Sequence, residues 1–169
     1  MPFIFIILTF FLATIAQPAS ACGVDTDCLI GERIYRIRLP KHYDPHTKIG
    51  AVLFAHGYKG SAAGTMANEA LGKAVSDLGL ALIAVKSAGD DWAIANSPEQ
   101  LAAKDWVETT YFDKVIADVT QRFAIDPSQL LMSGFSAGGM MTWTLACERS
   151  DKFIGFVPIS GTFWAPPPL

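Results

Sequence analysis

A serine between two glycines, Gly134-x-Ser136-x-Gly138, carries the strongest chemical signal in this chain of 169 residues. The spacing is that of a nucleophile elbow, a sharp strand-to-helix turn that lifts a serine hydroxyl above the edge of a sheet. Glycine is expected on both sides because a Cβ atom there would collide with the neighbouring strand and helix. The pattern predicts that Ser136 is the nucleophile of an acyl transfer. The alternative is a glycine-rich turn without chemistry.

The segment from His56 to Gly60 is the second candidate, because it follows an apolar run and precedes a helical pattern. Hydrolases with such an elbow take the first backbone N–H of their oxyanion hole from this junction. We expect that donor to be the N–H of Tyr58, paired with the N–H of Ala137 directly after the nucleophile. His56 itself is expected to anchor the turn, since the base of these enzymes follows the serine in the chain.

An acid and a base for Ser136 are not found where the expected order of serine, acid and histidine would place them. No histidine follows Ser136, and the only later acids are Glu148 and Asp151. Both fall at the far end of the helix that begins at the elbow, and at about 1.5 Å per residue they lie far from the hydroxyl. We interpret them as surface charges. We therefore expect a C-terminally truncated chain that lacks the last strands of the fold and is inactive on its own.

The elements that must hold these residues alternate between strand and helix patterns, as an α/β sheet requires. Residues 32–39 alternate apolar and polar side chains, which is typical of a half-exposed strand. Buried strands are expected at the apolar runs 51–55 and 80–85, and two further strands at 129–133 and 153–159. Helical spacing covers 62–78, which Gly79 would end, and also 112–123 and 137–147. A long irregular segment is expected at 87–105.

The N-terminal segment is almost wholly apolar from residue 3 to residue 16 and is followed by Ala19-Ser20-Ala21, a small-residue cleavage pattern. A bilayer span needs about 20 apolar residues, so a signal peptide over residues 1–21 is favoured over a retained anchor. A lipoprotein acylated at Cys22 is the second interpretation. Residues 22–169 would then form one incomplete hydrolase domain, secreted or periplasmic, without a stable membrane span.

The cysteines and charges narrow the class of protein. Cys22 and Cys28 flank a short polar loop, and export favours a disulfide between them over two free thiols. Cys147 falls in an apolar helical pattern, which indicates a buried thiol or one whose partner is missing. No cysteine has metal-ligand spacing, and we predict no metal and no cofactor. The net charge of -3, without clustered Lys and Arg, argues against a nucleic-acid partner.

Five stretches resemble the family of secreted α/β-hydrolases that contains polyhydroxybutyrate depolymerases and feruloyl esterases. They are residues 35–40, 53–57, 123–129, 134–141 and 156–161. The resemblance implies an α/β-hydrolase fold, a mostly parallel sheet with helices on both faces, and an ester substrate such as a polyester oligomer or a feruloyl or acetyl ester. It also implies Ser136 as nucleophile and Tyr58 and Ala137 as oxyanion donors. Many relatives have cysteine where this chain has Tyr58, which keeps the backbone N–H and changes the pocket.

Three classes of function stay open. A serine carboxylic-ester hydrolase comes first, because the elbow and the oxyanion segment occur together. A non-catalytic remnant or binding module of the same fold comes second, because the base is absent. A peptidase of similar fold comes third, since an elbow by itself does not separate ester from amide substrates.

Overall fold

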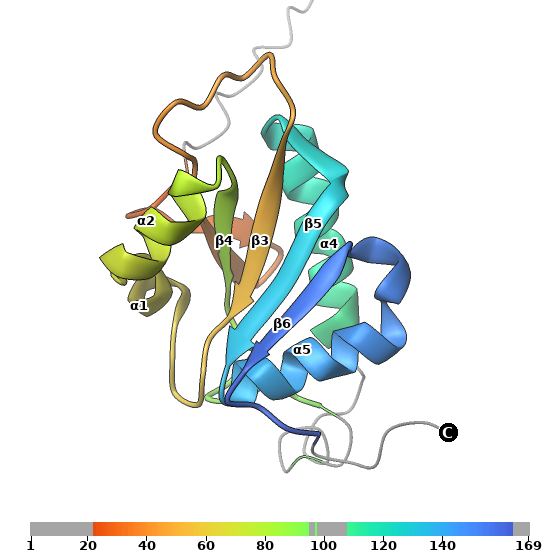
Figure 1. The fold of residues 1–169 in the computed structure, drawn as a ribbon. Helices are drawn as coiled ribbons and strands as arrows, with labels where there is room; N and C mark the ends of the chain where they lie inside the picture. The colour runs from red at the N-terminus through yellow and green to blue at the C-terminus, as the bar shows by residue number, and fades with distance from the viewer. Residues whose placement is uncertain (1–21, 95–96, 98–107, 164–169) are drawn as a thin grey trace, which may run out of the picture.

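The computed structural model describes residues 22–94, 97 and 108–163, which form a six-stranded sheet covered by helices on both faces (Figure 1). The strands are β1 (Cys28–Ile30), β2 (Arg33–Arg38), β3 (Ile49–Ala55), β4 (Ala81–Val85), β5 (Ile125–Phe135) and β6 (Gly155–Ile159). Their order across the sheet is β1-β2-β4-β3-β5-β6. Strands β4, β3, β5 and β6 run parallel, while β1 and β2 are antiparallel to their neighbours. The predicted α/β-hydrolase fold with a mostly parallel sheet is confirmed.

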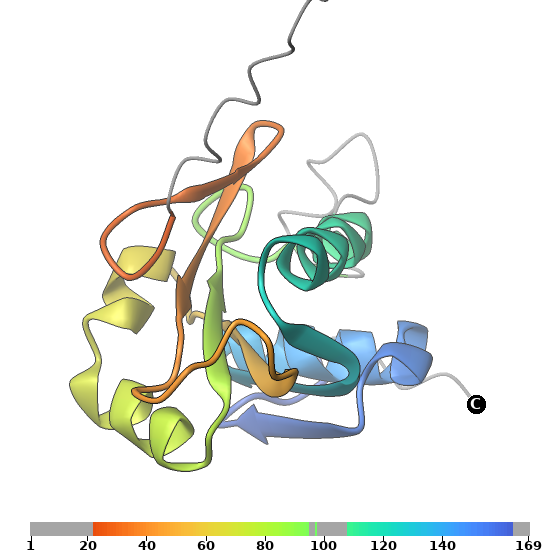
Figure 2. The ribbon, with the colours of Figure 1, turned by 90° about the horizontal axis from the view of Figure 1, so that it is seen from above.

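The helices cover the sheet in two pairs (Figures 1 and 2). One pair is α1 (Ala62–Met66) and α2 (Glu69–Asp77), and the other is α4 (Glu108–Arg122) and α5 (Ala137–Glu148). A short 3₁₀ helix, η1 (Ser150–Lys152), connects α5 to β6. The sheet is therefore the middle layer of three.

The core is divided by the sheet into two buried clusters. Val52, Phe54 and Leu82 pack with the α1 and α2 pair, whereas Leu53 and Ile83 pack with the α4 and α5 pair. Successive residues of a strand point to opposite faces, so each strand supplies both clusters in alternation. This is why β3 and β4 are continuous apolar runs in the sequence.

Residues 62–78 do not form the single helix that their spacing predicted. Helix α1 ends at Met66, and α2 begins at Glu69. The break occurs because the side chain of Asn68 caps α2 and accepts a hydrogen bond from the N–H of Leu71 at 3.0 Å. A side-chain cap satisfies a donor that a continuous helix would have bonded to its own backbone.

The predicted end of this helical stretch at Gly79 is confirmed. Gly79 has φ 73°, a left-handed conformation that glycine adopts without penalty. Its N–H bonds to the carbonyl oxygen of Ser76 at 2.9 Å, and the N–H of Leu80 bonds to that of Val75 at 3.3 Å. This pair of bonds is a Schellman motif, which directs the chain into β4.

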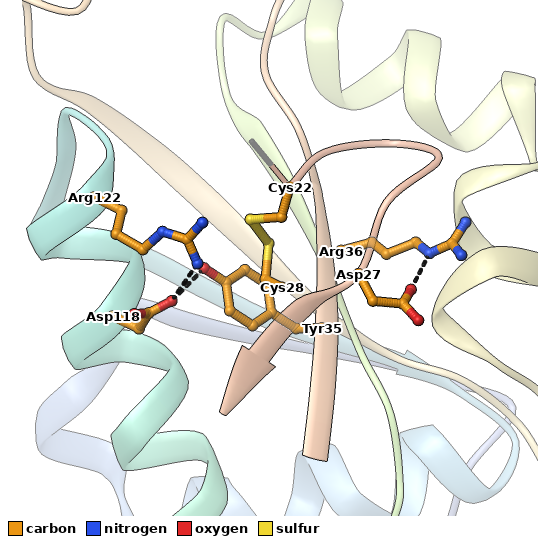
Figure 3. Close-up of a disulfide and its surroundings, with 7 residues drawn as sticks. All are labelled: Cys22, Asp27, Cys28, Tyr35, Arg36, Asp118 and Arg122. Carbon is orange, nitrogen blue, oxygen red and sulfur yellow. Dashed lines mark hydrogen bonds and ion pairs between the residues drawn. A yellow bond between two sulfur atoms is a disulfide. The ribbon is translucent and has the colours of Figure 1, made fainter. Parts of the chain in front are cut away.

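The N-terminal hairpin holds an element that the sequence analysis missed. Strand β1 pairs with β2 through a two-residue turn in which Gly31 has φ 59°. The structure joins Cys28 of β1 to Cys22 in a disulfide whose Cα atoms are 4.9 Å apart (Figure 3). From β2, the hydroxyl of Tyr35 donates a hydrogen bond to Asp118 of α4 at 2.6 Å. The hairpin is thus fastened to both the N-terminal loop and α4.

The prediction that Cys147 is buried is wrong, because its side chain is exposed near the end of α5. Met141 and Leu145 are the residues of α5 that face the core, and both are fully buried. Residue 147 is two positions beyond Leu145, a rotation of about 200°, so it lies on the solvent side of the helix.

The predicted signal peptide, residues 1–21, lies outside the described residues, as does most of the irregular segment predicted at 87–105. Within the described ranges, no helix is both long enough and apolar enough to cross a membrane. The same ranges contain no group of three or more His, Cys, Asp or Glu side chains that could hold a metal ion.

Candidate active site

The junction of β5 and α5 lies at the carboxyl end of the parallel strands (Figure 1), and Ser136 is the one residue between these two elements. Its backbone has φ 54° and ψ -116°, a region that residues with a side chain rarely occupy. Its N–H donates to the carbonyl oxygen of Ile159 at 2.9 Å, and its carbonyl accepts from the N–H of Met140 at 3.1 Å. Such strain persists only where the surroundings fix it, and here β6 and α5 both do. The side chain is half-buried.

The glycines on each side of Ser136 allow strand and helix to meet at contact distance. A Cβ atom on Gly134 would lie 2.2 Å from the carbonyl oxygen of Gly138. A Cβ atom on Gly138 would lie 1.9 Å from the carbonyl oxygen of Ala55. Only glycine fits at either position, because real Cβ atoms do not approach backbone oxygens so closely. Helix α5 therefore begins directly against the end of β3.

This close approach brings together the two segments that the sequence singled out. A Cβ atom on Gly57 would lie 3.3 Å from the carbonyl oxygen of Phe135 and 3.5 Å from the Cβ of Ser136. Residue 57 follows β3 by two positions, and residue 136 follows β5 by one. Because β3 and β5 are adjacent and parallel, their following loops meet at one edge of the sheet.

The segment after β3 forms a tight turn that presents Tyr58. The N–H of Gly60 bonds to the carbonyl oxygen of Gly57 at 2.9 Å, and Lys59 has φ 56° while Tyr58 does not have a positive φ. These features match a type II turn with lysine at the position that usually requires glycine. The N–H of Lys59 donates to the carbonyl oxygen of Asp90 at 2.7 Å. Among the described residues, the N–H of Tyr58 has no acceptor.

The second predicted donor is the N–H of Ala137. Ala137 is the first residue of α5, so its N–H has no carbonyl acceptor within the helix. Helix N-termini also carry partial positive charge, which favours an anion. The segments that carry the two N–H groups predicted as oxyanion donors thus lie in contact next to Ser136. That arrangement can stabilise a negative oxygen that develops beside Ser136.

His56 lies within this site and is engaged by other residues. Its Nδ1 donates to the carbonyl oxygen of Gly57 at 2.7 Å, and its Nε2 accepts from the N–H of Ser87 at 3.2 Å. The proton is assigned to Nδ1 because a backbone carbonyl can only accept. Burial lowers the pKa of His56, and the positive charges of Lys86 and Arg33 lower it further. A neutral ring with both nitrogens bonded holds the turn and does not reach Ser136.

The other titratable groups considered as partners lie far from the elbow. His42 and His46 are exposed and lie between β2 and β3, at the end of the sheet opposite Ser136. Glu148 is exposed at the last position of α5, about 16 Å along the helix axis from Ala137, and Asp151 is exposed in the following helix η1. Each therefore lies away from the hydroxyl of Ser136.

A buried polar network beside the site was not predicted. Glu108 is fully buried, forms an ion pair with Arg33 at 2.8 Å and accepts a hydrogen bond from the N–H of Ala93. The Arg33 guanidinium stacks on the ring of Tyr111 at 3.6 Å from its centre. Burial raises the pKa of Tyr111 to about 12. Residues 108 and 111 are one turn apart in α4, but Arg33 is 75 positions before Glu108, so only the folded chain brings the three together.

A hollow of about 230 Å³ lies on the face covered by α1 and α2, and its wall includes Phe135, the residue before Ser136. Its walls include Phe54, Gly57, Gly64, Leu71 and Phe135. The ring of Phe135 is half-exposed and stands next to the elbow. A larger hollow of about 960 Å³ lies between α2 and residues 38–42, far from Ser136. We take the smaller one as the candidate substrate pocket, because Gly57 and Phe135 in its wall are next to Ser136.

The Esterase family model matches residues 29–168 of this chain. A curated relative, poly(3-hydroxybutyrate) depolymerase of Ralstonia pickettii, is 32% identical over 136 residues, which cover 73% of this chain and 27% of that protein. Feruloyl esterase D of Neurospora crassa is 26% identical over 162 residues, covering 86% of this chain and 54% of that protein. This chain therefore spans about a quarter to about half of the length of these relatives.

Solved structures share the fold. The fluorophosphonate-binding serine hydrolase FphF of Staphylococcus aureus superposes with a TM-score of 0.61 at 22% sequence identity. The match covers 76% of this chain and 51% of that one. At this identity the likeness concerns the arrangement of strands and helices.

Proposed function

The chain belongs to the Esterase family, and from this premise we propose that its chemistry is the hydrolysis of carboxylic esters through an acyl-enzyme on Ser136. One observation carries the proposal. A half-buried serine hydroxyl stands on a strained elbow, and the backbone N–H groups of Tyr58 and Ala137 lie on the two segments that meet there. No metal is needed for this chemistry, because the charge that develops lies on one oxygen.

In the proposed reaction, the Oγ atom of Ser136 attacks the ester carbonyl carbon and loses its proton to a general base, for which solvent water or hydroxide is the only acceptor that the described residues leave. The carbonyl oxygen becomes negative in the tetrahedral intermediate and accepts hydrogen bonds from the N–H groups of Tyr58 and Ala137. The C–O bond to the alcohol then breaks, and the alcohol leaves with a proton. In the second step of the reaction, water attacks the acyl-enzyme and releases the acid.

We further propose that the 169 residues alone support only a residual rate. A serine without a base is a weak nucleophile at neutral pH. His56 is held by Gly57 and Ser87, and the other two histidines lie at the opposite end of the sheet. When one triad member is absent, what is left is catalysis by the oxyanion donors and by binding, about 10³-fold over water.

The proposed substrates are polyester oligomers and feruloyl or acetyl esters. The apolar walls of the pocket beside Ser136, especially Phe54, Leu71 and Phe135, suit an apolar acyl group or an aromatic ring. The names of the relatives, feruloyl esterase and poly(3-hydroxybutyrate) depolymerase, fall in the same class. The Cys22–Cys28 disulfide favours an oxidising compartment, which supports the proposal that a signal peptide over residues 1–21 directs secretion or periplasmic export.

Labelling with a fluorophosphonate probe, followed by peptide mass spectrometry, tests the role of Ser136. We expect a single adduct on Ser136 that is lost in Ser136→Ala. Ser160 is a matched control, because it also has a positive φ and is exposed at the end of a parallel strand. The labelling rate should rise about tenfold per pH unit up to pH 10, since none of the three histidines is placed to act as a base for Ser136. Equal labelling of Ser136 and Ser160 would refute the proposed nucleophile.

A second candidate is a non-catalytic binding module of the same fold, and the placement of the histidines favours it. This module would bind an ester or its acid in the pocket beside Ser136 without hydrolysing it. Calorimetric titration with methyl ferulate and with ferulate, combined with the fluorophosphonate labelling described above, separates the two candidates. Binding without any adduct at Ser136 supports the module, and an adduct at Ser136 supports the hydrolase.

A further inference from the structure

We propose that Lys86 and Trp92 are positioning residues that hold the proposed oxyanion turn, residues 56–60, in its strained form. They act through the loop of residues 87–92, which we name the backing loop. The inference rests on the proposed function, because the turn affects the reaction only if the N–H of Tyr58 meets the substrate oxygen. The placement of the turn itself can be measured without any catalysis.

Four hydrogen bonds join the backing loop to the oxyanion turn, one of them between the hydroxyl of Ser87 and Nε2 of His56 at 3.3 Å. The N–H of Ser87 donates to Nε2 of His56 at 3.2 Å, and the N–H of Lys59 donates to the carbonyl oxygen of Asp90 at 2.7 Å. The indole Nε1–H of Trp92 donates to the carbonyl oxygen of His56 at 2.8 Å. They engage the first residue of the turn and the residue just after Tyr58, so the peptide unit that carries the Tyr58 N–H is fixed from both sides.

Trp92 is the most constrained of these groups. Only 1% of its surface is exposed, and its ring lies 5.0 Å from that of His56 and 5.7 Å from that of Phe112. The carbonyl of His56 is the one that immediately precedes Gly57 and Tyr58 in the chain. A buried indole that donates to this carbonyl fixes the start of the turn, and without it a buried acceptor would be unsatisfied.

Lys86 stabilises the backing loop through hydrogen bonds from its side chain. Its ammonium donates to the carbonyl oxygen of Ser87 at 3.1 Å, to the hydroxyl of Ser87 at 2.9 Å and to the carbonyl oxygen of Gly89. The carbonyl of Lys86 itself accepts from Arg33 at 2.6 Å, which ties the loop to the buried pair of Arg33 and Glu108. One charged group thus bonds to residues 87 and 89 at the start of the loop, where the N–H of Ser87 bonds to His56.

The strain at Lys59 explains why the turn must be held by Lys86 and Trp92, an arrangement that we call the clamp. Lysine at φ 56° is disfavoured relative to ordinary backbone, and such a residue keeps that conformation only when its surroundings impose it. The bond from its N–H to Asp90 is the imposed contact. If the backing loop loosens, the turn can relax, and the N–H of Tyr58 then turns away from the elbow.

Amide hydrogen exchange by NMR tests the clamp on the chain of 169 residues. Trp92→Phe deletes the N–H donor and leaves a smaller aromatic ring in the core, while Lys86→Met keeps the stem and deletes the charge. We expect the exchange of the Lys59 amide to speed up about five- to tenfold in both variants, with the amides of β3 unchanged. Lys86→Arg should restore protection, because a guanidinium can donate to the same oxygens.

Tyr43→Phe is the matched control. The hydroxyl of Tyr43 accepts a hydrogen bond from the N–H of Ala124 at 2.8 Å, at the opposite end of the sheet. Its loss should speed exchange at Ala124 and leave Lys59 as in the wild type. If the Lys59 amide keeps its protection within about twofold in Trp92→Phe and Lys86→Met, the clamp is refuted. Equal acceleration in Tyr43→Phe would also refute it, because the effect would then be general.

Ester hydrolysis gives the second readout. Trp92→Phe should lower the limiting rate on p-nitrophenyl butyrate about tenfold with KM unchanged, because the turn contacts the oxyanion and not the ground-state ester. If Lys59 is deprotected while that rate is unchanged, the positioning role in the reaction is refuted and the clamp is only structural. A chain that shows no hydrolysis at all counts against the proposed function, and the exchange data then decide the clamp alone.

Discussion

Replacement of Tyr58 by proline removes the backbone N–H that we propose as an oxyanion donor, together with the tyrosine side chain. The position suits proline. Tyr58 is the first central residue of a type II turn, where proline is favoured because its φ is fixed near -65°. The turn is closed by the N–H of Gly60 and tied down by that of Lys59, and neither bond involves the N–H of residue 58. Tyr58→Pro should therefore leave the free energy of unfolding unchanged or slightly higher.

The effect on the rate follows from the number of donors. Two N–H groups, those of Tyr58 and Ala137, would face the oxyanion, and the loss of one costs about 3 kcal/mol of transition-state stabilisation, a rate about 150-fold lower. Tyr58→Ala keeps the N–H and changes only a side chain that is 59% exposed. It should retain the wild-type rate within about threefold. The difference between alanine and proline at one position isolates the backbone donor.

The assay is hydrolysis of p-nitrophenyl acetate and butyrate by the chain of 169 residues, with buffer as the reference. We expect the residual rate to depend on the N–H of Tyr58 and to be nearly insensitive to Ser136→Ala, because a serine without a base contributes little beyond the oxyanion donors. Melting curves for each variant confirm that the compared proteins are folded.

Two outcomes would contradict this reasoning. Equal rates for Tyr58→Pro and Tyr58→Ala would mean that the turn after β3 is not an oxyanion hole. Abolition of turnover by Ser136→Ala would mean that a base does serve Ser136 within these 169 residues, and the proposal of a residual rate alone would be wrong.

Further predictions concern the close approach at the elbow, the disulfide and a buried phenol. Gly138→Ala should lower the free energy of unfolding in urea by at least about 3 kcal/mol, because the new Cβ would lie 1.9 Å from the carbonyl oxygen of Ala55; a loss below about 1 kcal/mol contradicts that contact. Reduction of the Cys22–Cys28 disulfide should cost about 2 kcal/mol, the loop-closure entropy of its short ring, seen as a lower melting temperature in reductant; an unchanged melt argues against the bridge. Burial raises the pKa of Tyr111 to about 12 from 10.0, so the stabilising effect of its protonated form is present below pH 10 and is lost as the pH rises from 10 to about 12. Unfolding at alkaline pH, followed with phenolate absorbance, should be less steep in Tyr111→Phe.

The order of the elements could be predicted because their patterns are local. Apolar runs at 51–55 and 80–85 indicated buried strands, and the spacing after residue 112 indicated a helix. The division of residues 62–78 into two helices was missed, because the apolar spacing continues across Asn68. Whether Asn68 caps a new helix depends on its backbone conformation, which the spacing does not reveal. Strand β1 was missed because three residues carry too little pattern, and its disulfide and its pairing with β2 define it.

The candidate site divides in the same way. Its reactive serine, its flanking glycines and its two donor segments follow from short motifs, since each motif is a few consecutive residues whose backbone must bend in one manner. The backing loop, the Trp92 donor and the buried pair of Arg33 and Glu108 follow from no motif. Their residues are separated by tens of positions, and they come into contact only because the sheet places β4 between β2 and β3.

The sequence by itself therefore determined the class of fold, the identity of the candidate nucleophile and the position of the turn expected beside it. Tertiary structure alone decided that residue 57 touches residue 136, that His56 is bonded away from the serine and that a second loop supports the turn. The physical reason is that local backbone preferences act over a few residues, whereas the contacts that orient a side chain depend on which distant segments the sheet places next to each other.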